Sequence, residues 1–345
     1  MTTNRLIAPG RPIEALPLQP AWLGLGLAMS WIAIVVLAYA VAHVAIGPVD
    51  LPMSAVPFVW TVLVNATLIG VVLGGHAHLH QKARSDLETL RPLLPDDGAA
   101  FERLLVDVPN LAPSTRWAMT LGGMIGGIAV ATLDPNLREV NRHLSASDPR
   151  YVVFLLQNVL FGVLGARLVA AEIHMTRAYA RLGERVRVDL FEPSTLLVFA
   201  RKGLRSVVVW VLVSSTFSMF WVLESAGQTN VFLPIGVLVL VTAALVAPTR
   251  GVHLSILAAK QAELSRVAEA IRAESARTLT PRDPTALPED ARLGNLIQYQ
   301  DYVRSIREWP FDLSIVARSI GLIVLGAGSW LGGAIVERLL EVALD

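Results

Sequence analysis

The sequence contains no cysteine, which excludes disulfide bonds, thiolate nucleophiles and cysteine-ligated metal sites. Charged residues are scarce: they make up 17% of the 345 residues, whereas soluble domains carry about a quarter. Their signs also balance, with 29 basic and 28 acidic residues, so no excess of positive charge indicates a nucleic-acid partner. Apolar residues make up 54% of the chain. We therefore expect an integral membrane protein of a cytoplasmic (inner) or plasma membrane, with the lipid bilayer as a partner.

Motifs of catalysis are missing as well. The chain has no Gly-x-Ser-x-Gly nucleophile elbow, no His-Glu-x-x-His zinc helix and no glycine loop for phosphate. Histidines stand at positions 76, 78 and 80, but only His76 and His80 share a helix face. A zinc site would need a third ligand, and none is near in the sequence. We therefore predict no enzyme activity, no metal site and no cofactor.

Seven apolar stretches are long enough, at about 20 residues each, to cross a bilayer. Lysine and arginine cluster in alternate connections, namely 1–20, 76–116, 172–205 and 250–312, and such clusters mark the cytoplasmic side. This bias predicts an all-α integral membrane protein with seven transmembrane helices, the amino terminus inside and the carboxyl terminus outside. The predicted spans are 21–46, 54–75, 117–134, 151–171, 206–224, 231–249 and 313–339.

Three spans are followed by stretches rich in Ala, Leu, Arg, Lys and Glu, which are strong helix formers. We expect these spans to continue as helices into the cytoplasm, over 76–94, over 172–190 and from residue 250 onward. Proline and polar residues then predict a loop over 278–292. The predicted divisions are a cytoplasmic tail (1–20), six spans with their extensions (21–249), cytoplasmic helices (250–312), and the seventh span with a short outer tail (313–345).

The approach to the last span is broken by the pair Trp309-Pro310. Before the break, apolar residues recur at helical spacing over 293–308, which predicts an amphipathic cytoplasmic helix. Proline disfavours the helical conformation of the residue before it, so Trp309 and Pro310 form a hinge between a cytoplasmic and a membrane half. An amphipathic helix away from lipid must bury its apolar side in protein. We therefore expect a homo-oligomer formed through 255–275 and 293–308.

Small and polar residues follow one face of the last span. At 100° per residue they fall within a narrow arc, a pattern that lipid-facing surfaces do not use. This face is either a close helix contact or the wall of a pore, in which a ring of Glu337 carboxylates near the outer mouth would favour cations. The candidate pore-lining residues are Leu322, Gly326, Ser329, Gly333 and Glu337.

A second candidate site combines aromatic and polar residues in the outer halves of the fourth and fifth spans. Aromatic walls with a few polar groups are typical of small-ligand pockets. Interhelical hydrogen bonding without a ligand is the alternative. The candidate pocket residues are Tyr151, Phe154, Gln157, Asn158, Phe217, Phe220 and Trp221.

Glycines in the third span are spaced for close helix contact. The stretch "GGMIGG" places Gly122 above Gly126 and Gly123 above Gly127, four residues apart. Pairs of this kind let two helices approach closely in lipid. We therefore expect this span to pack against another helix through its glycines.

The last helix is divided into "LGNLIQYQDYVRSIRE" and "FDLSIVARSIGLIVLGAGSWLGGAIVERLL". Together with seven spans and helices that extend into the cytoplasm, this organisation resembles the insect odorant and gustatory receptor superfamily. The resemblance covers the whole chain, although the family's Thr-Tyr…Gln-Phe signature in the last helix is absent. It implies a tetrameric cation channel in which cytoplasmic helices form a central anchor and the final half-helices line the pore.

Two functions therefore compete. One is an oligomeric channel that conducts cations, with a small molecule as a candidate gating ligand. The other is a non-conducting membrane sensor or assembly scaffold of the bacterial type. A secondary transporter would show paired broken helices near the bilayer midplane, and the sequence has one break, at Pro310.

Overall fold

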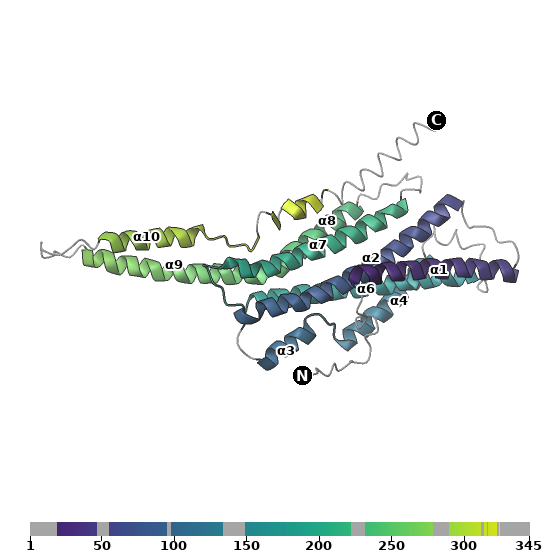
Figure 1. Cartoon of the computed structure of the whole chain (residues 1–345), viewed down its shortest axis with the longest axis horizontal. Coiled ribbons are helices and arrows are strands. Elements are labelled where there is room, and N and C mark those ends of the chain that lie inside the picture. The colour runs from purple at the N-terminus through teal and green to yellow at the C-terminus, as the bar shows by residue number, and fades with distance from the viewer. Residues whose placement is uncertain are drawn as a thin grey trace, which may run out of the picture.

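The computed structural model describes residues 19–46, 55–94, 98–133, 149–221, 232–278, 290–311, 314–315, 317–322 and 324. These residues form helices and connecting loops and contain no strand (Figure 1). The helices are α1 (Pro20–Ile46), α2 (Ala55–Leu90), α3 (Gly98–Asp107), α4 (Pro113–Leu133), α6 (Pro149–Gly183), α7 (Leu197–Ser218), α8 (Phe232–Val246), α9 (Arg250–Thr278) and α10 (Asp290–Ser305). Short 3-10 turns are η1 (Arg91–Leu93), η2 (Pro193–Leu196), η3 (Met219–Trp221) and η4 (Ala247–Thr249).

Five helical stretches in the described part of the chain are long and apolar enough to cross a membrane. The described residues thus agree with the expectation of an all-helical chain whose helices can cross a membrane. Of the other two predicted spans, 206–224 coincides with α7 and η3 as far as Trp221, and most of 313–339 lies outside the described residues. The five stretches are Pro20–Val44, Phe58–Leu93, Pro113–Leu133, Arg150–Gly183 and Leu238–Arg277.

Several helices are much longer than their apolar segments. Helix α2 runs unbroken past His76 to Leu90, and α6 runs past Glu172 to Gly183. Helix α8 continues through η4 into α9, which lies antiparallel beside α10 and projects away from the other helices (Figure 1). The Tyr299 hydroxyl of α10 donates to a Glu263 carboxylate oxygen of α9 at 3.0 Å, which fixes the register of this hairpin.

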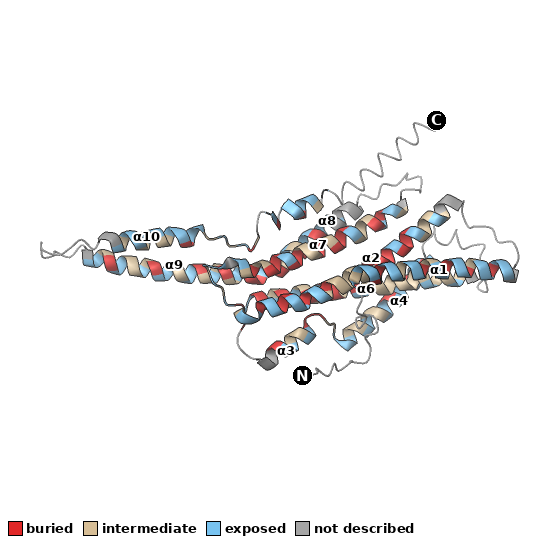
Figure 2. Ribbon diagram, in the orientation of Figure 1, coloured by how far each residue is buried: buried red, intermediate tan, exposed pale blue. Residues whose placement is uncertain are grey.

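Four clusters of buried side chains hold the described helices together. The first, around Trp31 and Ile69, joins α1 to α2, and the second, around Trp210, joins α7 to α2, α6 and α8. The third, around Leu87 and Phe199, lies where the extended ends of α2 and α6 meet α3 and the starts of α7 and α9. The fourth, around Leu79 and Met175, joins α2, α6 and α7. In contrast, the outward sides of α1 and α4 are largely exposed (Figure 2), as expected for helices that face lipid.

Helices α4 and α6 form the most extensive contact between two described helices, and glycine lets them approach closely. A Cβ atom on Gly123 would lie 2.5 Å from the Gly162 carbonyl oxygen of α6, and one on Gly127 would overlap the Asn158 carbonyl. Positions 122 and 126, on the other side of α4, have no atom within 4 Å of such a Cβ. The predicted glycine contact is therefore present, and only one of the two glycine pairs forms it.

The difference between the two glycine pairs can be tested with one variant in each pair. Gly127→Ala should lower the free energy of unfolding by about 1–3 kcal/mol, because the new methyl group forces two backbones apart. Gly126→Ala should leave stability unchanged or raise it slightly, because alanine has the higher helix propensity. Thermal unfolding of both variants in detergent micelles measures the difference, and equal effects would contradict the contact.

Candidate functional site

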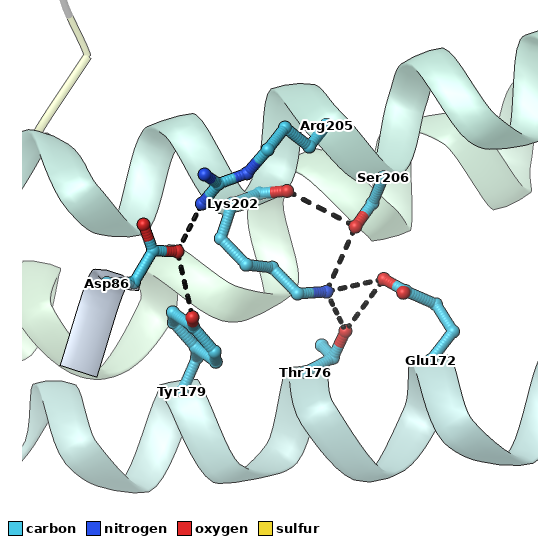
Figure 3. Close-up of polar contacts among 7 residues, drawn as sticks. All are labelled: Asp86, Glu172, Thr176, Tyr179, Lys202, Arg205 and Ser206. Atoms are coloured by element: carbon cyan, nitrogen blue, oxygen red, sulfur yellow. Dashed lines mark hydrogen bonds and ion pairs between the residues drawn. The ribbon is translucent and has the colours of Figure 1, made fainter. Parts of the chain in front are cut away.

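A network of buried charges joins three helices where their apolar segments end. Lys202 of α7 reaches Glu172 of α6, with 2.5 Å between Nζ and Oε1, and their side chains are 4% and 7% exposed. The ammonium group also donates to the hydroxyls of Thr176 and Ser206, both at 3.0 Å (Figure 3). An ammonium group has three N–H donors, so each of them has an acceptor here.

A second ion pair adds α2 to the network. Arg205, one turn after Lys202 on α7, pairs with Asp86 of α2. The same carboxylate oxygen of Asp86 accepts a hydrogen bond of 2.9 Å from the buried hydroxyl of Tyr179 on α6 (Figure 3). The Tyr179 ring also packs edge-to-face against Phe199, with ring centroids 6.1 Å apart. The two ion pairs and the aromatic contact thus fix α2, α6 and α7 relative to one another.

The network is suited to holding helices in register rather than to chemistry. The second carboxylate oxygen of Glu172 has no hydrogen-bond partner among the described residues, so Lys202 alone balances this charge directly. Removing one member of a buried ion pair costs about 3–5 kcal/mol, because the other charge stays buried without a partner. Among the described residues, no three His, Asp or Glu side chains gather as metal ligands.

The predicted hinge is held against α9 by stacked rings. Helix α10 ends at Ser305, and the chain passes through Trp309 and a buried Pro310 before helical residues resume at 314. The Trp309 ring stacks on His253 of α9, with centroids 4.0 Å apart and planes inclined by 10°. The Trp309 ring also stacks on Phe311, with centroids 5.7 Å apart. The interruption of the helix is thus a well-packed joint.

Hydrogen bonds reinforce the same joint. The Lys260 ammonium group of α9 donates to the Ile306 carbonyl at 2.9 Å and to the Glu308 carboxylate at 3.2 Å. The His253 ring nitrogen Nδ1 lies 2.9 Å from the Glu308 carbonyl oxygen. We call the contacts of His253 and Lys260 with 306–309 the α9 clamp. It fixes the chain on α9 just before the last predicted span.

Aromatic residues connect the hairpin to the loop between α6 and α7. Phe191 of that loop stacks on Tyr299 and Tyr302 of α10, with centroids 6.1 and 5.8 Å apart. Burial, together with the hydrogen bond to Glu263, raises the pKa of Tyr299 above its ordinary value. Phe191 and Tyr302 remain exposed on their other sides.

The predicted ligand-pocket residues lie on α6 and at the end of α7 with the adjoining η3. Tyr151, Phe154, Gln157 and Asn158 are half-buried on α6, where the Asn158 amide donates to the Phe154 carbonyl of its own helix at 3.0 Å. Phe217 and Phe220, on α7 and η3, pack edge-to-face with centroids 5.7 Å apart. Phe220 also packs against the cluster around Trp210, and the side chain of Trp221 lies outside the described part. A pocket formed by both groups stays a prediction.

Of the predicted pore-lining residues, the structure describes Leu322. Its side chain packs against the cluster around Trp210 and Val241, so within one chain it faces the bundle. Ile315 and Ser319 are buried as well, whereas Arg318 is exposed. Gly326, Ser329, Gly333 and Glu337 lie outside the described residues, and their place along a pore stays a prediction.

The charged network was not predicted from the sequence. Its acids and bases stand far apart in the chain: Lys202 follows Glu172 by 30 positions, and Arg205 follows Asp86 by 119. A partial signal was present at Glu172, because Leu168, Val169 and Met175, each one turn away on the same helix, are apolar. No protein-family model, curated protein or solved structure matches the chain.

The buried tyrosine gives a test of the network. Tyr179→Phe keeps the ring against Phe199 but removes the donor to Asp86, so it should lower the free energy of unfolding by about 1.5–3 kcal/mol. Tyr299→Phe is the control, because water can replace its hydroxyl beside Glu263 and the loss should stay below about 1 kcal/mol. Chemical unfolding in micelles measures both losses. An equal loss for the two variants would contradict the role of Tyr179.

Proposed function

We propose that the protein is a homo-oligomeric membrane channel that conducts cations, with its last helix lining the pore. The observation that carries the proposal is the α9 clamp. It holds the start of the last predicted span on α9, the helix whose far end forms the projecting hairpin with α10. A displacement of the hairpin would therefore pass directly to the last span, as the gate of a channel requires.

The proposed orientation puts the hairpin and the charged network at the cytoplasmic side. Support comes from the lysines and arginines of alternate connections, and from the level of the buried ion pairs. Charges are expensive inside a bilayer, and Asp86, Glu172 and Lys202 lie just beyond the most apolar segments of their helices. On this orientation α2, α6 and α9 extend inward, the amino terminus is inside and the carboxyl terminus outside.

Assembly in the proposal uses the hairpin. Phe191, Ile297 and Tyr302 are large apolar or aromatic side chains exposed on or beside α10, and in a cytoplasmic element they need a protein partner. A second copy of the chain is the partner we propose. The resemblance to the odorant and gustatory receptor superfamily favours four copies around one axis.

The pore itself is assigned to Gly326, Ser329, Gly333 and Glu337. These residues share one helical face, and four copies would place a ring of Glu337 carboxylates near the outer mouth. Such a ring favours cations over anions. A small molecule bound near Phe217 and Phe220 is the proposed gating ligand.

An assembly scaffold is the second candidate function. The exposed rings of Phe191 and Tyr302 favour it, because they provide a contact surface that needs no pore. In that case the small residues of the last helix would pack against another helix instead of lining a path for ions.

Measurements of ion conductance distinguish the channel from the scaffold. Purified oligomers in planar bilayers should give cation-selective currents, and Glu337→Gln should reduce the preference for cations over anions by about tenfold. Ser329→Leu should abolish the currents while assembly, checked by mass photometry, stays intact. Asp301→Asn removes one exposed carboxylate from α10 and should change neither property.

Two different results would contradict the proposal. Assembled protein without current in any applied voltage or ligand mixture would contradict the channel and favour the scaffold. Currents whose selectivity ignores Glu337 would remove that residue from the pore.

A further inference from the structure

A shallow polar pocket opens where α2, α4 and α6 meet. His76 and His80 of α2 form one wall, with ring centroids 4.3 Å apart. Arg116 of α4, Arg167 of α6 and Asn110 of the loop before α4 form the rest of its polar lining. The pocket lies one residue from Glu172 along α6, at the level where the apolar segments end.

The charge of the pocket is positive. None of its lining residues is acidic. The guanidinium groups of Arg116 and Arg167 make no hydrogen bond or ion pair with any described residue. Two arginines that converge on one cavity without a carboxylate favour an anion, and the planar guanidinium group matches the oxygens of a phosphate.

The size of the pocket suits a single compact group. The space open to the centre of a water molecule is about 30 Å³, more than one water needs. A nucleotide or a peptide would not fit inside it. The oxygens of one phosphate group would, with the rest of the ligand outside the opening.

The surface of α4 indicates what that ligand is. Beginning one residue after Arg116, Trp117, Leu121 and Ile125 repeat at one-turn spacing and are 68%, 55% and 69% exposed. Such a face suits acyl chains, and tryptophan is enriched at the level of lipid headgroups. Basic pockets between membrane helices bind the headgroups of anionic lipids.

We propose that this pocket binds the phosphate of an anionic phospholipid whose acyl chains lie along α4. The lipid joins α2, α4 and α6 at the membrane boundary, beside the ion pair of Glu172 and Lys202. This site is independent of conductance, so it stands or falls separately from the channel.

Lipid retention by the full-length protein tests the proposal. In native mass spectrometry from detergent micelles, the protein should retain phosphatidylglycerol in preference to phosphatidylcholine. Arg116→Gln and Arg167→Gln should each weaken this binding about tenfold, because each removes one charge-assisted contact. The double variant should lose about a hundredfold, whereas the charge-matched control Arg103→Gln with Arg177→Gln should bind as the native protein does.

Other results of the same experiment would overturn the proposed lipid site. Unchanged binding in both single variants, or equal retention of phosphatidylcholine, would overturn the pocket as an anionic-lipid site. Displacement of phosphatidylglycerol by millimolar inorganic phosphate would identify free phosphate as the ligand and overturn the lipid assignment. If the double variant fails to fold, the two single variants and the phosphate competition still decide.

Discussion

The buried contact between Lys202 and Glu172 is the constraint on which the arrangement of the helices depends. An apolar helix face tolerates small rotations and shifts, because one leucine packs much like another. A buried ammonium group does not, since a shift of one turn would leave two charges without partners. The contact therefore fixes α7 against α6, and the Arg205–Asp86 pair, with Tyr179 on the same carboxylate, fixes α2 against both.

That fixed unit organises the parts around it. On its membrane side, α7 packs against α8 through the cluster around Trp210. On the other side, α9 continues from α8, packs its Val252 and Ile256 into the cluster with Phe199, and carries the α9 clamp. The start of the last predicted span is thus attached to a helix seated on the charged unit. The basic pocket between α2, α4 and α6 lies at the same level, where a bound lipid would add to the same constraint.

Local patterns predicted the fold better than the site. Apolar length and helix formers indicated membrane helices that continue past the bilayer, and α2 and α6 run unbroken to Leu90 and Gly183. The restriction that Pro310 places on the backbone of the residue before it predicted the break after α10. The glycine spacing predicted a close contact, but the choice of Gly123 and Gly127 over their neighbours depends on the direction from which α6 approaches. The partners of Lys202 and Asp86 depend on tertiary packing, which cannot be predicted from periodic patterns in the local sequence.

A double-mutant cycle on the central ion pair tests this account most directly. The free energies of unfolding of the native protein, Glu172→Leu, Lys202→Met and the double variant are measured in the same micelles. The account predicts that the double variant is far more stable than the sum of the single losses implies, with a coupling of at least about 2 kcal/mol, because replacing both charges leaves neither unpaired. Single losses that add within about 0.5 kcal/mol would show that the two residues act independently, and would contradict the account.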